Sequence, residues 1–392
     1  MTSITDIRHL TLKYSPLILA AFLMVENTLA APQQAPYLPS TVINQVTWDS
    51  ANRIQAATGS DLWPTTWGQD GNIYTAWGDG GGFGGSNSLG RVSMGIARLE
   101  GMPPTFTGIN VNGGINPLYA SSFPSKGKTA GILSVNGVLY SWVNMQNGNP
   151  PDKKLAWSSD LGKTWQLSTW KFPDQIDPQF SPETFVNFGQ DYAGAMDNYI
   201  YSYGGKWIPA QGASNDAYLI RVDKQKIMTR SAYQFFSGFD SNKNPVWSNS
   251  IQDRKPVYSD PNGIGNSGMV SVIYNAPLKR YFLTVAHRAP AGTGNSYPDF
   301  GTLSNLGIFD SAKPWGPWTT VAYYDNWLGF GDNDEALAFS FPGKWISADG
   351  KTMWLIFSGY PSADNFNLIK ATLTLSPTTT PSIPSGLIIK KK

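Results

Sequence analysis

The stretch Gln69-Asp70-Gly71-Asn72-Ile73-Tyr74-Thr75-Ala76-Trp77 decides the fold class. Asp-Gly forms a tight turn, and the β-branched and aromatic residues after it favour an extended strand. The same pattern of turn and strand returns four more times, at residues 136–142, 196–203, 275–285 and 348–357. Long amphipathic helical patterns are missing between these runs. The sequence therefore predicts an all-β protein.

The spacing of these runs predicts how the strands are arranged. Their last apolar residues, Trp77, Trp142, Tyr203, Val285 and Phe357, are 65, 61, 82 and 72 residues apart, and each run is followed by a further strand. Repeats of this size that cannot bury their own faces favour radial stacking, so we predict a five-bladed β-propeller. A β-sandwich is the alternative, because its hairpins would look locally similar. Residues 42–48 are predicted to add an outer strand to the last blade and close the ring.

The two ends of the chain differ in composition from the middle. Residues 1–31 combine a basic start, a short apolar run at 17–25 and small residues before Pro32, which predicts a secretion signal; a buried N-terminal helix is the alternative. Residues 32–375 are predicted to form a single propeller domain, and residues 376–392 a Pro/Thr/Ser linker with a basic tail. We therefore expect a monomer secreted to the extracellular space or the periplasm, with no membrane contact after cleavage.

Composition excludes several kinds of chemistry. The chain has no cysteine, and His287 is its single histidine beyond the predicted signal, so thiol catalysis, a histidine-clustered zinc site and a Ser-His-Asp triad are not expected. The net charge of +2 comes without a clustered basic face, so nucleic acid is not an expected partner. No cofactor is required by the chemistry that remains.

Hairpin geometry gathers certain polar residues at one mouth of the predicted channel. In an antiparallel hairpin, the start of the first strand and the end of the second lie at the same end. Residues placed there by the second strands are Asp79, Asn144, His287 and Arg288; those placed by the first strands are Asp61, Lys126 or Lys128, Asn187, Asn266 and the run Asp332 to Glu335. We expect Asn144, Asn187, Asn266, His287, Arg288 and Glu335 to bind substrate.

Asp61 and Asp79 form the strongest candidate pair, because they open and close the first hairpin. Two carboxylates on either side of a glycosidic bond are sufficient to hydrolyse it: one protonates the leaving oxygen, and the other activates water or attacks the sugar. Trp63 and Trp77 are expected beside the pair, where an apolar setting would raise the pKa of the acid and their rings would contact substrate. The alternative is that both Asp side chains only bond turn amides.

Two further candidates carry alternatives of their own. His287 could shuttle a proton or hold a sugar hydroxyl, although a packed histidine is equally consistent with the sequence, and Arg288 could bind an acidic sugar or form a surface ion pair. Asp332 and Asp334 lie in an oxygen-rich run that could bind calcium, although the spacing of a known calcium loop is incomplete. A solvated loop is the alternative there.

One local motif resembles a known structural element. Ser158-Ser159-Asp160-Leu161-Gly162-Lys163-Thr164-Trp165 fits the Asp-box of sialidase-type propellers, Ser-x-Asp-x-Gly-x-Thr-Trp, at each fixed position. In that motif the Asp and Gly shape a turn and the Trp packs between blades. The match therefore supports a propeller, and Asp160 is not expected in an active site.

A wider resemblance covers residues 47–375. The stretches at 61–80 and 272–284, and the segments 306–309 and 314–318, resemble secreted bacterial proteins of the domain of unknown function 4185 type. That family implies a five-bladed propeller and includes endo-D-arabinanases with paired Asp residues on the first blade, at positions that match Asp61 and Asp79. Trp63 and Gly80 depart from the family pattern of Gly after Asp-Leu and Thr after the second Gly-Asp.

Together these features predict a glycoside hydrolase that acts on an extracellular polysaccharide or glycan, with Asp61 and Asp79 as acid and base in either order. A polysaccharide lyase using His287 and Arg288, and a glycan-binding propeller without catalysis, are the alternatives. A sialidase is not expected, because its arginine triad does not assemble from these blades.

Overall fold

The computed structural model describes residues 33–120, 123–124, 126–147, 152–172, 180–206, 215–265, 269–288, 304–330, 336–360 and 364–377. All of them belong to the second of the two units into which the chain divides, which begins at Gln33. These residues form strands and short 3-10 turns, so the all-β class is confirmed. None of the helical turns among them has the length and apolar character needed to span a membrane.

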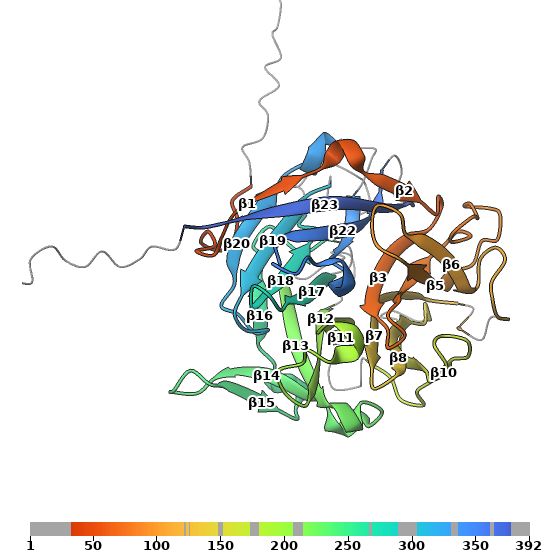
Figure 1. Cartoon of the computed structure of the whole chain (residues 1–392). Coiled ribbons are helices and arrows are strands. Elements are labelled where there is room, and N and C mark those ends of the chain that lie inside the picture. Colours follow the sequence, from red (N-terminus) through yellow and green to blue (C-terminus); the bar gives the residue numbers. More distant parts are fainter. Residues whose placement is uncertain are drawn as a thin grey trace, which may run out of the picture. The chain divides into compact units, whose positions relative to one another are not determined.

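The first two sheets are simple four-stranded antiparallel meanders (Figure 1). One has the order β3-β4-β5-β6, with β3 (Asp61–Trp67), β4 (Ile73–Gly78), β5 (Met94–Glu100) and β6 (Thr107–Asn112). The other has the order β7-β8-β9-β10, with β7 (Lys128–Val135), β8 (Val138–Asn144), β9 (Lys153–Ser158) and β10 (Gln166–Leu167). In both sheets the chain order is the spatial order, because each connection is a hairpin.

The next two meanders share one sheet. The third contains β11 (Phe180–Asn187), β12 (Tyr199–Lys206), β13 (Asp216–Asp223), β14 (Gln234–Phe239) and β15 (Pro245–Ser248), with β16 (Pro256–Ser259) paired to β13. The fourth contains β17 (Val270–Asn275), β18 (Arg280–Val285), β19 (Leu306–Ser311) and β20 (Thr319–Tyr324). A short parallel pairing of β11 with β17, at Val186 with Val272 and Asn187 with Ile273, joins the two meanders.

The last sheet brings the two ends of the described chain together. It contains β21 (Ala336–Ser340), β22 (Thr352–Gly359) and β23 (Phe366–Leu375), and β23 pairs antiparallel with both β1 (Ile43–Trp48) and β2 (Ile54–Ala56). Figure 1 shows β1 and β23 side by side. The outer strand predicted at residues 42–48 therefore forms, and it covers an edge of β23 that would otherwise be open.

Short 3-10 turns connect the strands. They are η1 (Ser50–Asn52), η2 (Gln190–Tyr192), η3 (Lys224–Lys226), η4 (Arg230–Ala232), η5 (Ile251–Asp253), η7 (Trp327–Gly329) and η8 (Gly343–Trp345).

The first strand of each meander lines one common cavity. Residues of β3, β7, β11, β17 and β21 face it together. The described parts of β3, β7, β11 and β21 each contain a shift in pairing register, between Leu62 and Thr65, Thr129 and Gly131, Pro182 and Thr184, and Leu337 and Ser340. A bulge of this kind bends a strand and turns its side chains, which suits strands that converge on an axis.

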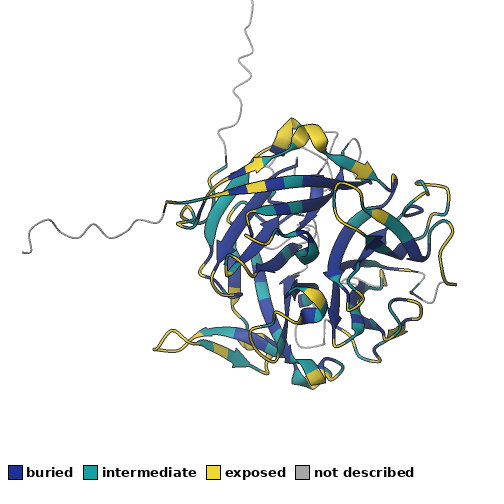
Figure 2. Cartoon of the chain, in the orientation of Figure 1, coloured by how far each residue is buried: buried dark blue, intermediate teal, exposed yellow. Residues whose placement is uncertain are grey.

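Aromatic side chains fill the space between neighbouring sheets. Trp142 of β8 is fully buried, stacks on Phe185 of β11 at a ring distance of 5.5 Å, and donates a hydrogen bond from Nε1 to Ser202 Oγ at 3.1 Å. Trp63 and Trp77 stack within the first sheet at 6.0 Å, and Phe366 of β23 lies edge-on to Trp63 at 5.2 Å. Figure 2 shows the inner strands dark blue, as expected of sheets that bury both faces. The packing of aromatic rings within and between the sheets accounts for the 15 tryptophans of the chain.

Candidate functional site

The structure brings Asp61 and Asp79 to the same end of the first hairpin. Asp61 begins β3 and pairs with Gly78, the last residue of β4, and Asp79 follows directly. A Cβ atom at Gly78 would stand 2.2 Å from Asp61 Oδ1, so glycine is required there for the carboxyl group to keep its place.

The backbone beside this pair is strained. Leu62, Trp63 and Asp79 have φ angles of 78°, 61° and 53°, a region that L-residues with side chains rarely adopt. Each such residue costs about 1–3 kcal/mol, and such residues cluster at functional sites. The bulge at Leu62 and Trp63 sends Trp63 into the core and leaves Asp61 at the strand end.

Asp61 lies in a setting that favours its protonated form. The residue is partly buried, and within the described chain its Oδ1 is inaccessible to solvent and has no hydrogen-bond partner. Burial raises the pKa of Asp61 to about 7; Lys128 and Arg91 oppose this shift, and the nearby carboxylates of Asp364 and Asp79 add to it. A carboxyl group with this pKa can donate a proton near neutral pH.

Asp79 is held by two cations. Lys128 Nζ lies 2.5 Å from Asp79 Oδ1, and Arg91 Nη2 lies 3.1 Å from Oδ2. The Asp79 side chain is 30% exposed, so solvent reaches it. Lys128 begins β7 of the second sheet, whereas Asp79 and Arg91 belong to the first. The site therefore spans two sheets, and of the two lysines that the sequence offered, Lys128 is the one that contacts the pair.

A third carboxyl group that the sequence analysis missed approaches from the last sheet. Asp364 precedes β23, and its backbone oxygen accepts a hydrogen bond from Gly59 N at 2.6 Å. Leu62 N donates to Ser358 Oγ at 2.7 Å, which ties β3 to the end of β22. Burial raises the pKa of Asp364, and Asp79 adds to this. Asp364 lies between β22 and β23 and neither begins a first strand nor ends a second one, so the rule that found Asp79 does not reach it.

The third meander contributes a carboxylate that was also missed. Glu183 lies in the bulge of β11, forms an ion pair with Lys153 at the start of β9, and accepts a hydrogen bond from Ser181 Oγ at 3.0 Å. Asn187 was predicted at the start of this strand, and that prediction is wrong. Asn187 ends β11 instead of beginning it, because the strand starts at Phe180.

Two of the asparagines predicted to bind substrate, Asn187 and Asn144, lie in described strands and have hydrogen-bond partners within the protein. Asn187 Nδ2 donates to Thr65 O at 3.2 Å, and its Oδ1 accepts from Thr66 Oγ1 at 2.7 Å, at the far end of β3 from Asp61. Asn144 pairs with Lys128 across β7 and β8, and its Oδ1 accepts from Gln146 N at 2.9 Å. Asn144 therefore lies at the mouth and Asn187 does not.

His287 is fully buried against the outer strand of its meander. Its Nε2 lies 3.0 Å from Tyr324 O, its Nδ1 lies 3.1 Å from Gln33 Oε1, and its ring stacks on Tyr323 at 3.8 Å. Burial lowers the pKa of His287 to about 4, while Asp325 opposes the shift. This is the packed-histidine alternative of the sequence analysis. Arg288 is partly buried and lies against Gly263.

The two tryptophans named for substrate contact are in the core. Trp63 and Trp77 are both 0% exposed, so the structure uses their rings as packing beneath the carboxyl pair. The remaining predicted residues, Asn266, Asp332, Asp334 and Glu335, lie outside the described residues. Across the described ranges, no group of three or more His, Cys, Asp or Glu side chains is arranged to hold a metal ion.

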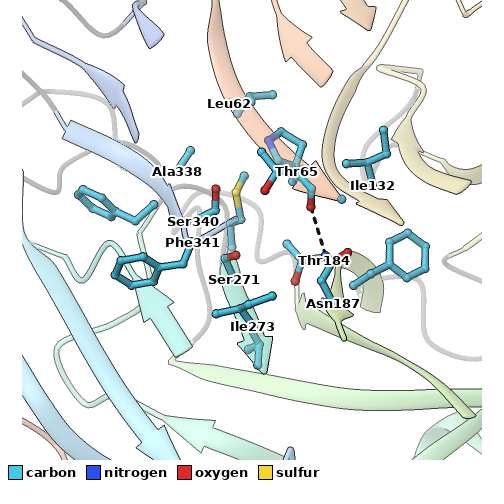
Figure 3. A pocket seen from close by; sticks show the side chains of 17 residues that line it. Leu62, Thr65, Ile132, Thr184, Asn187, Ser271, Ile273, Ala338, Ser340 and Phe341 are labelled. Atoms are coloured by element: carbon cyan, nitrogen blue, oxygen red, sulfur yellow. Dashed lines mark hydrogen bonds between the residues drawn. The ribbon is translucent and has the colours of Figure 1, made fainter. Parts of the chain in front are cut away.

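The cavity lined by the five first strands is narrow. Side chains from all five first strands face it, among them Leu62, Thr65, Ile132, Thr184, Ser271 and Ser340 (Figure 3). Its volume is about 30 Å³, room for roughly two water molecules and too small for a sugar ring. Asp61 and Asp79 are not among the residues that line it.

Asp160 is used by its own turn. Its carboxylate accepts hydrogen bonds from Thr164 N at 2.9 Å, Thr164 Oγ1 at 2.7 Å and Ser158 Oγ at 2.8 Å. These bonds lower its pKa against the effect of burial. The carboxylate of Asp160 is therefore engaged within its own turn.

Comparisons with known proteins give the following matches. Residues 129–294 match the family model described as domain of unknown function (DUF4185). No curated protein matches the sequence. Similar solved structures include a GH43_1 enzyme from Xanthomonas citri, with 11% identity, a TM-score of 0.44, and coverage of 81% of this chain and 89% of that one.

Two further solved structures give similar values. A thermostable family-43 glycoside hydrolase has 13% identity, a TM-score of 0.42 and coverage of 81% and 89%. A family 43 glycoside hydrolase from Bacillus licheniformis has 10% identity, a TM-score of 0.43 and coverage of 80% and 70%. Similarity at this level assigns neither substrate nor mechanism.

Proposed function

We propose that this chain is a glycoside hydrolase built on a five-bladed β-propeller that the N-terminal strand closes. The five meanders with first strands on one cavity, and the pairing of β1 with β23, support this interpretation of the fold. The observation that carries the function is the pair of unlike carboxyl groups at one end of the first hairpin: Asp61 is partly buried with one unpaired oxygen closed to solvent, and Asp79 is held in ion pairs.

The two environments support a different catalytic role for each carboxyl group. Asp61, with a pKa of about 7, donates its proton to the glycosidic oxygen as the bond to the anomeric carbon breaks. Asp79, ionised between Lys128 and Arg91, accepts a proton from the water whose oxygen bonds to that carbon. Each of the two products carries a new hydroxyl group. Proton exchange with water then returns a proton to Asp61 and removes one from Asp79.

The substrate class follows from the same site and from the family resemblance. The cavity lined by the five first strands holds only about 30 Å³, and the endo-D-arabinanases of the resembled family act on arabinofuranosyl linkages. We infer a neutral or weakly charged extracellular polysaccharide, with arabinans the first to test. Secretion as a monomer after removal of residues 1–31, and calcium at Asp332 and Asp334, remain predictions.

The lyase alternative has less support. It needs His287 as a base at the mouth, but both ring nitrogens of His287 face internal partners and the ring is fully buried. The glycan-binding alternative differs from the hydrolase only in turnover. The same experiment therefore separates it.

The test is turnover by the mature protein and two isosteric variants. Residues 32–392 are incubated with a panel of arabinans and other plant, algal and bacterial polysaccharides, and reducing ends are measured. Asp61→Asn and Asp79→Asn should each lower turnover by at least about 10³-fold while the far-UV circular dichroism stays unchanged. Binding without any product would favour the glycan-binding alternative, and full activity in either variant would remove that residue from the mechanism.

A further inference from the structure

Lys128 occupies an unusual place between the two carboxyl groups. It begins β7 of the second sheet, yet its stem crosses to the first sheet, where its Cδ lies 3.0 Å from the position of a Cβ at Gly78. Its ammonium group donates to Ser93 O at 3.1 Å and contacts Asp79 Oδ1 at 2.5 Å. The ammonium group of Lys128 is therefore held by two partners, and its stem runs alongside Gly78.

The second cation on Asp79 is held less firmly. Arg91 is 43% exposed, whereas Lys128 is 24% exposed, and Arg91 is tied to Asn87 of its own loop. An exposed ion pair contributes little because water screens it and its side chains lose entropy on pairing. Lys128 is thus the more buried of the two cations, and it holds Asp79 Oδ1. The more exposed Arg91 holds Oδ2.

We propose that Lys128 is the positioning residue of the catalytic site: the second sheet supplies it to hold Asp79 as an oriented anion beside Asp61. The proposal rests on the proposed function. Lys128 touches neither the water nor the sugar in this scheme, and acts through Asp79 and Asp61.

The surroundings of Asp61 show the same coupling. Four charged groups face it: Lys128 and Arg91, which favour its ionised form, and Asp364 and Asp79, which oppose it. Lys128 is the larger of the two favourable influences. Without Lys128 the protonated form of Asp61 should persist to higher pH, and the orientation of Asp79 should be lost.

The experiment compares Lys128→Met, which keeps the stem, with Lys370→Met. Lys370 makes an ion pair of 3.1 Å with Asp49, away from the site, and serves as the matched control. In Lys128→Met we expect kcat to fall about 10- to 100-fold with little change in KM, because a misplaced catalytic group costs rate and not binding. The basic limb of the pH–rate profile should move up by roughly one pH unit. Lys370→Met should keep the wild-type profile.

A second variant separates charge from packing. In Lys128→Ala, added methylammonium or ethylammonium should restore part of the lost kcat in a saturable way, whereas a structural role would not be rescued. An unchanged kcat and pH profile in Lys128→Met, or no rescue of a folded Lys128→Ala, would overturn the proposal.

The outcome is separable from that of the proposed function. If the wild type hydrolyses no glycan, the hydrolase proposal fails, and the Asp61 carboxyl is titrated instead by carbon-13 NMR in the wild type and in Lys128→Met. An upward move of the Asp61 midpoint in the variant supports the electrostatic part of the inference, and superimposable titrations refute it.

Discussion

Asp61 should lower the stability of the folded protein at the pH where it works. Its pKa is raised from 3.8 to about 7, mainly because burial disfavours the charged form. Between these values the folded protein keeps a proton that the unfolded chain releases, so stability falls as pH rises through this window. At 1.36 kcal/mol per pKa unit, the full penalty above pH 7 is about 4 kcal/mol.

Replacing Asp61 by Asn removes this penalty, because an amide does not ionise. The Asp61→Asn variant should therefore gain stability relative to the wild type as pH rises, by about 3 kcal/mol between pH 5 and pH 8. Any unpaired amide hydrogen in the variant adds a constant cost, which cancels when the two pH values are compared. The variant should be inactive and, at pH 8, the more stable protein.

Urea unfolding followed by tryptophan fluorescence measures this, since the chain has 15 tryptophans. The free energy of unfolding is determined for both proteins at pH 5, 6, 7 and 8, with Asp160→Asn as a control whose difference from the wild type should stay constant over this range. Parallel stability curves for wild type and Asp61→Asn would refute the claim that Asp61 is buried and protonated near neutrality.

Three further outcomes follow from the structure. Gly78→Ala should lower turnover at least about 100-fold while the protein stays folded, because the added methyl group would stand 2.2 Å from Asp61 Oδ1; near-normal kcat would contradict the site geometry. Burial disfavours the imidazolium form of His287, so the wild type should lose about 3 kcal/mol of stability as pH falls from 6.5 to about 4. His287→Gln should not show this loss, and urea midpoints measured at pH 7.5 and 4.5 check this. Asp160→Ala should cost about 1–2 kcal/mol of stability through its lost turn hydrogen bonds but leave kcat unchanged, and a catalytic defect with intact folding would show that the turn does more than shape the sheet.

Most of the strands were predictable from local patterns. The run at 280–285 is β18 as predicted, and the runs at 72–77, 137–142, 198–203 and 352–357 match β4, β8, β12 and β22 within one to three residues at each end. Turn residues and β-branched or aromatic residues carry this information locally, so tertiary contacts are not needed to read it. The strand at Ile43–Trp48 was predictable in the same way, and its pairing with β23 agrees with the outer strand expected there.

The candidate site was predictable where it depended on one hairpin, and failed where it depended on strand boundaries or on other sheets. Asp61 and Asp79 meet because an antiparallel register puts them there. Asn187 was misplaced because Phe180 to Asn187 contains Pro182 and Glu183, which hid the start of β11. Glu183 was overlooked for the same reason.

The sequence by itself determined the strand-and-turn repeat, the absence of thiol chemistry and the two carboxyl groups at the end of the first hairpin, because each of these is local in the chain. Tertiary structure alone decided which of the carboxyl groups is buried and which is paired, since the partners, Lys128 and Asp364, come from other sheets. It also decided that His287 and the tryptophans pack inside. Burial and charge act through space, and a linear pattern does not specify which distant side chains will share that space.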